Sequence, residues 1–208
     1  MTHIRHSEKV FNMKRLLLIL ILTFSFQTLT KANDIRDFEV EGISIGDSLL
    51  NYYSKKEIKN KLLKTPSTYT NDEIKRVWFN LDNPKIYSTL NIHFLNNQSY
   101  KIVSLGGIEY FENDMASCYS KQDQAVNDMK NTFPNASAND LETYNHESGK
   151  IVKSIVRDIS IYLNNGSITI VCTDWSKETT SKHNWTDNLG IYLESDDFTD
   201  WINNKAYK

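Results

Sequence analysis

The chain has 208 residues and a formal net charge of −2 at pH 7, from 24 Lys and Arg against 26 Asp and Glu. Nucleic acid is not an expected partner, because binding to a phosphate backbone draws on clustered basic charge that this chain lacks. The two cysteines and five histidines show no spacing typical of a metal site, and we expect neither a metal nor another cofactor.

The N-terminus carries the pattern of an export signal. A basic pair, Lys14-Arg15, precedes the apolar run LLLILILTFSF of residues 16–26. Thr30 and Ala32 then offer the small side chains that suit cleavage before Asn33. The run is shorter than the ~20 apolar residues that a membrane-spanning helix needs. A membrane-anchoring helix is the alternative. No cysteine directly follows the run, so a lipid anchor is not expected.

We therefore expect residues 1–32, upstream residues plus a signal peptide, to be removed. Residues 33–208 would then form a single domain in the periplasm or outside the cell, with no stable membrane insertion. The first 32 residues carry five basic and one acidic side chain, which leaves 19 basic against 25 acidic ones and a net charge of −6. The 176 residues that remain are enough for a sizeable core.

The first predicted element is a short strand, FEVEG, followed by GISIG at residues 42–46, which matches the G-x-S-x-G turn of serine hydrolases. A catalytic turn of this kind needs a strained serine, whereas the serine here is flanked by β-branched isoleucines that resist strain. The next helix is expected to begin at Asp47 or Ser48. A plain strand-to-helix turn is favoured, and Ser44 as the nucleophile of a secreted hydrolase is the alternative.

Two short helices, DSLLNYY and SKKEIKNKLL, are predicted next, the second with Ser54 and Glu57 as a capping box. A polar connector leads into the strands IKRVWFNL and IYSTLNIHFL. The second strand alternates between an apolar side with Ile92 and a polar side with Asn91 and His93, which is typical of a half-buried antiparallel strand. His93 is therefore expected to be a surface histidine.

The strand SYKIVSLGGIEYF follows an NNQ turn, and Gly106-Gly107 within it is interpreted as a bulge. The helix ENDMASCYSKQDQAVNDMKNTF ends before Pro134 and has apolar residues every three or four positions. After the polar loop NASANDLETYNHESG, KIVKSIVRDISIYL and SITIVCTDW form a hairpin across NNG. The strand NLGIYLES and the helix DDFTDWINNKAY, capped by Ser195, complete the chain.

These elements predict an α+β domain with an antiparallel sheet of about six strands and helices packed mainly on one face. HFLNNQSYKIVS echoes IYLNNGSITIVC at an offset of 68 residues. The echo indicates either a duplicated helix-plus-hairpin unit or two hairpins that converged on Asn-rich turns.

The two cysteines have the positions expected of a structural disulfide. Cys118 lies on the apolar side of its helix, and Cys172 shares a strand side with Ile168 and Ile170. If the helix lies on the sheet, both cysteines point into one core and can form a disulfide, which an oxidising compartment favours. Two buried unpaired cysteines are the alternative.

One group of side chains suggests a binding patch. CTDWSKE and HNWTDNLG place aromatic and acidic residues around one loop after a core strand. Aromatic residues on loops can form a platform for sugars or partner proteins, although two tryptophans can also simply close the end of a core. The candidate residues are Asp174, Trp175, His183, Trp185 and Asp187.

The strings FEVEGISIGDSLLNYYSKKEIKN, LGGIEYFENDMASCYSK, DWSKE and WTDNLGIYLESDDFTDWINNKAY resemble a family of small exported proteins from marine alphaproteobacteria. The resemblance covers essentially the whole chain after residue 32. It implies export and a similar organisation, and it implies no catalytic residue, since that family has no assigned activity.

GISIGDS, followed by two helices and a three-strand meander, also resembles the small lipoproteins of the outer-membrane assembly machinery and the β-lactamase-inhibitor-like folds. This second resemblance covers the first half of the chain. The missing lipid-bearing cysteine departs from the lipoprotein pattern, so neither anchoring nor an assembly role is implied. The sequence favours a non-enzymatic protein of the bacterial envelope that binds another protein or a small ligand.

Overall fold

A computed structural model describes residues 34–65, 69–146 and 153–208. The predicted leader and its cleavage site lie outside these ranges. Within them, no helix is long and apolar enough to cross a membrane.

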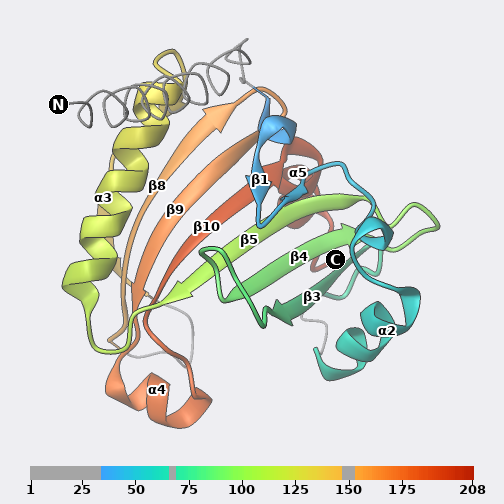
Figure 1. Cartoon of the computed structure of the whole chain (residues 1–208), viewed down its shortest axis with the longest axis horizontal. Coiled ribbons are helices and arrows are strands. Elements are labelled where there is room, and N and C mark those ends of the chain that lie inside the picture. Colours follow the sequence, from blue (N-terminus) through green and yellow to red (C-terminus); the bar gives the residue numbers. More distant parts are fainter. Residues whose placement is uncertain (1–33, 66–68, 147–152) are drawn as a thin grey trace, which may run out of the picture. The chain divides into compact units, whose positions relative to one another are not determined.

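One antiparallel sheet of eight strands dominates the described residues (Figure 1). Its strands follow the order β3-β4-β5-β10-β9-β8-β6, with β7 also paired to β8. A separate two-stranded hairpin, β1-β2, packs against it, with Val40 next to Gly107 of β5. The strand bounds are β1 Glu39–Val40, β2 Ile43–Ser44, β3 Ile74–Asn80, β4 Thr89–Leu95, β5 Ile102–Tyr110, β6 Ser137–Ala138, β7 Glu142–Asn145, β8 Ile155–Leu163, β9 Gly166–Asp174 and β10 Asn188–Ser195.

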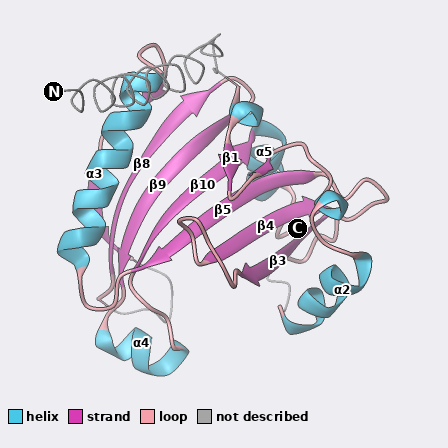
Figure 2. Ribbon diagram, viewed as in Figure 1, coloured by secondary structure: helices cyan, strands magenta, loops and turns pink. Residues whose placement is uncertain are grey.

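Helices connect and flank these strands (Figure 2). Local sequence explains where they begin. The Ser54 hydroxyl accepts from the N–H of Glu57, whose carboxylate accepts from the N–H of Ser54, and Ser195 caps the last helix as predicted. The helix bounds are η1 Ile35–Asp37, η2 Leu49–Asn51, α2 Lys55–Lys64, α3 Met115–Thr132, α4 Lys177–His183 and α5 Asp196–Asn204.

The prediction of an antiparallel α+β fold is confirmed, but the predicted six strands were too few. The additional strands, β6 and β7, lie in the segment that was expected to be a polar loop. Every residue of both strands is exposed. Because these edge strands cover no core, they carry no apolar alternation by which a sequence could reveal them.

An arrangement of one helix and three meandering strands occurs twice, although in the second copy β6 and β7 follow the helix and α4 precedes the last strand. The units α2-β3-β4-β5 and α3-β8-β9-β10 meet where the last strand of each, β5 and β10, pairs with the other. In this arrangement β4 corresponds to β9. The sequence echo instead matches the hairpin β4-β5 with the hairpin β8-β9, so that β4 would correspond to β8 and not to β9. The echo therefore does not follow the symmetry of the sheet.

The main core lies on one side of the sheet, under α3 and the N-terminal elements. Cys118 on α3 and Cys172 on β9 form the predicted disulfide, with their Cα atoms 6.2 Å apart. The fully buried Gln122 adds a polar tie, because its Nε2 donates to the carbonyls of Arg157 and Ile170 over 2.7 and 3.0 Å. Helix α3 is thus joined to the sheet covalently and by hydrogen bonds.

A smaller apolar cluster lies under α5, formed by Ile74, Val103, Phe198, Trp201 and Ala206. It also covers His93, which is 7% exposed, 4.6 Å from the Phe198 ring and hydrogen-bonded through Nε2 to the Tyr69 hydroxyl over 3.0 Å. The expectation of a surface histidine was wrong. The alternation in β4 identified the side of the strand correctly, but α5, which covers that side, is more than 100 residues away in the sequence.

The bulge predicted at Gly106-Gly107 is also misplaced. The pairing of β5 with β4 runs without interruption through both glycines and shifts only between His93 and Phe94. Glycine is needed at these two positions because neighbouring side chains leave no room for a Cβ atom. A Cβ on Gly106 would lie 2.5 Å from Tyr192, and one on Gly107 would lie 2.6 Å from Tyr87.

Candidate functional site

The chain reverses direction around α4, beyond the end of β9 (Figure 2). The Ser176 hydroxyl caps this helix by accepting from the N–H of Thr179. The buried Thr179 hydroxyl in turn accepts from the Ser154 hydroxyl, which keeps the start of α4 beside Ser154. Asn184 ends it in the left-handed conformation, at φ 55°. This tight return brings the segment after α4 back beside the end of β9.

Four aromatic rings meet at this end of β9, and we call them the aromatic cluster: His146, Trp175, His183 and Trp185. The ring centroids of Trp175 and Trp185 are 4.6 Å apart, and those of His183 and Trp185 are 4.9 Å apart. His146 adds a contact of 5.5 Å to Trp175. Trp185 remains 39% exposed, so the cluster presents an aromatic surface to the outside.

The two predicted acids adjoin this cluster. Asp187 accepts the N–H of Trp175 with its side chain over 2.8 Å, and its carbonyl accepts the N–H of Phe111. Burial raises the pKa of the Asp174 carboxyl, and the nearby charge of Asp187 raises it further. The structure therefore brings all five predicted residues together in a continuous chain of contacts.

His146 is the member that sequence reasoning missed. It follows β7, and its N–H donates to the carbonyl of Ser154 over 2.8 Å, which places it beside the start of β8. The signal that could have identified it was the pairing of β7 with β8. That strand was expected to be a loop, so no pattern in the sequence linked His146 to Trp175.

The chemistry available at the aromatic cluster is recognition of a flat or apolar surface. Aromatic rings on loops supply contact area with little conformational freedom to lose. The Nε2 atom of His183 is buried and has no hydrogen-bond partner among the described residues, which leaves one polar atom for a ligand. Among all the described residues, no three His, Cys, Asp or Glu side chains are grouped as a metal ion requires.

Ser44 lies in the small hairpin β1-β2, which forms a two-stranded sheet separate from the main one. Gly42 and Gly46 on either side have φ of 82° and 93°, values that favour glycine, and Ser48 caps η2. The backbone N–H of Ser44 donates to the Asp47 carboxylate over 3.3 Å. Among the described residues, no hydrogen bond connects the Ser44 hydroxyl to a histidine, and its strand pairs antiparallel in a two-strand ribbon.

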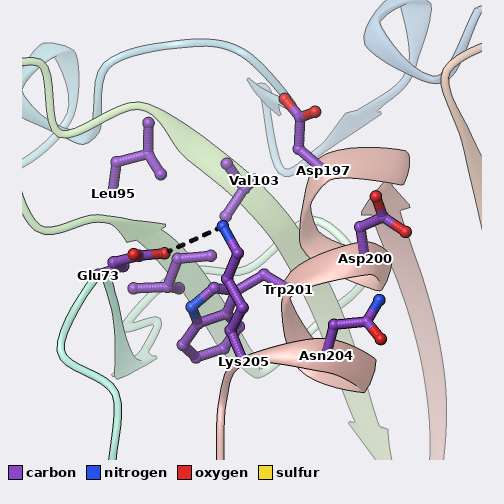
Figure 3. A pocket seen from close by; sticks show the side chains of 9 residues that line it. Glu73, Leu95, Val103, Asp197, Asp200, Trp201, Asn204 and Lys205 are labelled. Carbon is purple, nitrogen blue, oxygen red and sulfur yellow. Dashed lines mark ion pairs between the residues drawn. The ribbon is translucent and has the colours of Figure 1, made fainter. Parts of the chain in front are cut away.

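A pocket of about 350 Å³ opens beside α5 (Figure 3). Its floor is apolar, with Ile74, Leu95 and Val103, and its rim is charged. Across the rim, Lys205 faces Glu73 at 3.8 Å, in an ion pair whose side chains are both more than half exposed. Such an exposed pair contributes little to recognition, so this pocket is a weaker candidate than the aromatic cluster.

Comparisons with protein-family models, with curated proteins and with solved structures found no match to this chain. The two resemblances noted in the sequence therefore stay predictions.

Proposed function

We propose that this chain is an exported, non-enzymatic binding protein that holds another protein or a small ligand at the aromatic cluster. The observation that carries the proposal is the contact of four aromatic rings from three separate segments, with Trp185 39% exposed at their edge. Few residues carry most of the affinity of a binding surface, and tryptophan is prominent among them.

Two further features support this proposal. The disulfide between Cys118 and Cys172 suits an oxidising compartment. We also infer that the helices cover mainly one face of the sheet, with α2 and α3 on the side of the main core. This arrangement leaves the loop end and much of the opposite sheet face available for contacts.

The first test compares Trp185→Ala with Tyr207→Ala. The second variant removes another exposed aromatic side chain, one that is not part of the aromatic cluster. The mature protein is used to recover partners from a bacterial envelope extract after chemical cross-linking. We expect recovery to fall about tenfold or more for Trp185→Ala and to stay at the wild-type level for Tyr207→Ala. Equal recovery by both variants would remove the aromatic cluster from consideration.

A second measurement addresses the enzyme alternative. A fluorophosphonate probe labels serines that a neighbouring base has activated. We expect no labelling of the mature protein. Labelling that disappears in Ser44→Ala would replace binding with hydrolysis as the function.

A further inference from the structure

The side of the sheet opposite the main core is unusually polar. Its strands carry hydroxyl, amide, charged and aromatic side chains there. Helix α5 covers this side around His93, and we call the remainder of the surface the polar face. Pairing in register defines its central row, which crosses six strands from β3 to β8: Trp78, Asn91, Gly106, Tyr192, Thr169 and Ser160.

Asn91 is the first indication that the polar face has a ligand. Only 7% of the residue is exposed, yet its Oδ1 has no hydrogen-bond partner among the described residues. Nearly all buried side-chain acceptors in folded proteins are hydrogen-bonded, because leaving one unpaired is costly. Asn91 Oδ1 therefore offers a site to a donor that the described chain does not provide.

Tyr192 is the second indication. A Cβ on Gly106 would lie 2.5 Å from one edge of its ring, and a Cβ on Gly190 would lie 2.5 Å from the other edge. The ring thus lies flat over two strands, in a space that only glycine leaves free, and its other face points away from the sheet. Burial raises the pKa of the phenol to about 12, so its hydroxyl keeps its proton at neutral pH.

The charged groups on this face do not neutralise each other. Glu194 and Arg76 belong to the next row, three strands apart, and neither side chain forms an ion pair with a described residue. Burial raises the pKa of the Glu194 carboxyl, which favours its neutral form. Arg76 lies 5.9 Å over the ring of Trp78. The face therefore mixes donors and acceptors without a concentrated charge.

We propose that the polar face binds a neutral oligosaccharide. Sugar hydroxyls supply the donor that Asn91 Oδ1 lacks and hydrogen-bond with Tyr192 and Glu194. The apolar C–H side of a sugar ring packs on the flat face of Tyr192, because aromatic rings favour such contacts. Trp78, three strands away in the same row, offers a second ring to another sugar of the chain. Neighbouring strands are ~4.8 Å apart, so the central row extends over about 24 Å and suits an extended chain of sugars.

This site is independent of the aromatic cluster, since the two share no residue. It also differs from a surface for an apolar partner, which would show exposed Leu, Ile or Phe in place of Asn91, Thr169 and Ser160. Scattered polar groups around a few aromatic rings are the arrangement that fixes the orientation of a small polar ligand.

The test titrates neutral hexasaccharides of glucose, with α-1,4, β-1,4 or β-1,3 linkages, into the mature protein and measures binding by calorimetry. Hexamers of galacturonate and glucosamine serve as anionic and cationic probes. The variants are Asn91→Leu, which removes the unpaired acceptor, and Thr169→Arg, which places a long side chain beside Tyr192. Thr132→Arg on α3 is the matched control for charge, and Trp185→Ala tests the aromatic cluster.

We expect at least one neutral hexasaccharide to bind, with affinity reduced about tenfold or more by Asn91→Leu and Thr169→Arg and unchanged by Thr132→Arg and Trp185→Ala. The Tm of Asn91→Leu should equal or exceed that of the wild type, since a buried unpaired acceptor is removed. Absence of binding by every neutral probe, binding of a charged probe alone, or binding that Asn91→Leu retains would each overturn the proposal. A marked fall in the Tm of Asn91→Leu would show that Oδ1 is already satisfied, and would overturn it too.

Discussion

His93 shows how burial changes the properties of a single residue. It lies on the polar side of β4, where an exposed imidazole was expected, but α5 and Tyr69 enclose it. Burial lowers the pKa of His93 from 6.5 to about 3, and the charge of Arg76 contributes in the same direction. The folded protein therefore holds this imidazole in its neutral form.

The consequence is a loss of stability in acid. Because the unfolded chain takes up a proton near pH 6.5 and the folded one does not, the contribution of His93 is complete above pH 6.5. It is lost as the pH falls from 6.5 towards 3. We expect the slope to reach at most about 1.4 kcal/mol per pH unit.

Urea unfolding of the wild type and of His93→Gln at pH 7.5, 6.5, 5.5 and 4.5 measures this contribution. The wild type should lose more unfolding free energy than the variant at each step below pH 6.5. Subtraction of the two curves removes the effect of the carboxylates, such as Glu41 and Asp114, whose pKa values are lowered on folding. Parallel curves would show that the imidazole is solvated in the folded protein.

At the scale of elements, helix ends and hairpins were predictable because the interactions that form them are local. Ser54 and Glu57 are three residues apart and complete a capping box by themselves. The turn between β8 and β9 needs only a short Asn-Gly segment, in which Asn165 adopts φ 63°. By contrast, β6 and β7 form by pairing with the free edge of β8. No local pattern in their own sequence indicates that pairing.

The disulfide connects α3 to β9 and closes a loop of 54 residues. For a loop of that length, chain entropy predicts a stabilisation of about 4 kcal/mol. We expect the reduced protein to unfold at a lower urea concentration, with a free energy smaller by roughly that amount. The core around both sulfurs is buried, so the bond should resist mild reductant until the protein opens.

Thiol counting and urea unfolding, with and without strong reductant, make the comparison. The Cys118→Ala, Cys172→Ala double variant controls for the reductant and should resemble the reduced wild type. Two free thiols in protein purified from its natural compartment would contradict both the bond and the inferred export.

At the scale of the molecule, the sheet joins two similar units through its centre. β5 and β10 pair over seven residues, and one apolar cluster contains side chains from both units, including Leu105 and Leu193. The polar face runs across the same junction, since Asn91 and Gly106 come from one unit and Tyr192 from the other. Neither unit contains the core or the polar face alone.

A division of the chain at the turn after β5 tests this dependence. We expect residues 33–111 to lack cooperative thermal unfolding when produced alone, because ten of the 23 buried residues of the main core are absent and β5 becomes an open edge. Mixing with residues 112–208, which retain the disulfide, should restore the circular dichroism of the intact protein. A sharp melting transition of the first fragment alone would show that the unit folds independently.

The sequence alone was sufficient for the features that depend on near neighbours or on simple periodicity. These are the antiparallel α+β class, the helix caps, the sides of β4, the disulfide pair and the proximity of Trp175 to Trp185. Each rests on spacing within a segment or on the shared apolar sides of two segments.

Only the tertiary structure decided which sides are covered and what lies beside them. The burial of His93, the arrival of His146 at Trp175, and the fit of Tyr192 over Gly106 all join residues that are distant in sequence. Periodicity shows which way a side chain points, but not what packs against it. That depends on strand order and on the elements that cross the sheet, because burial and hydrogen bonding are set by neighbours in space.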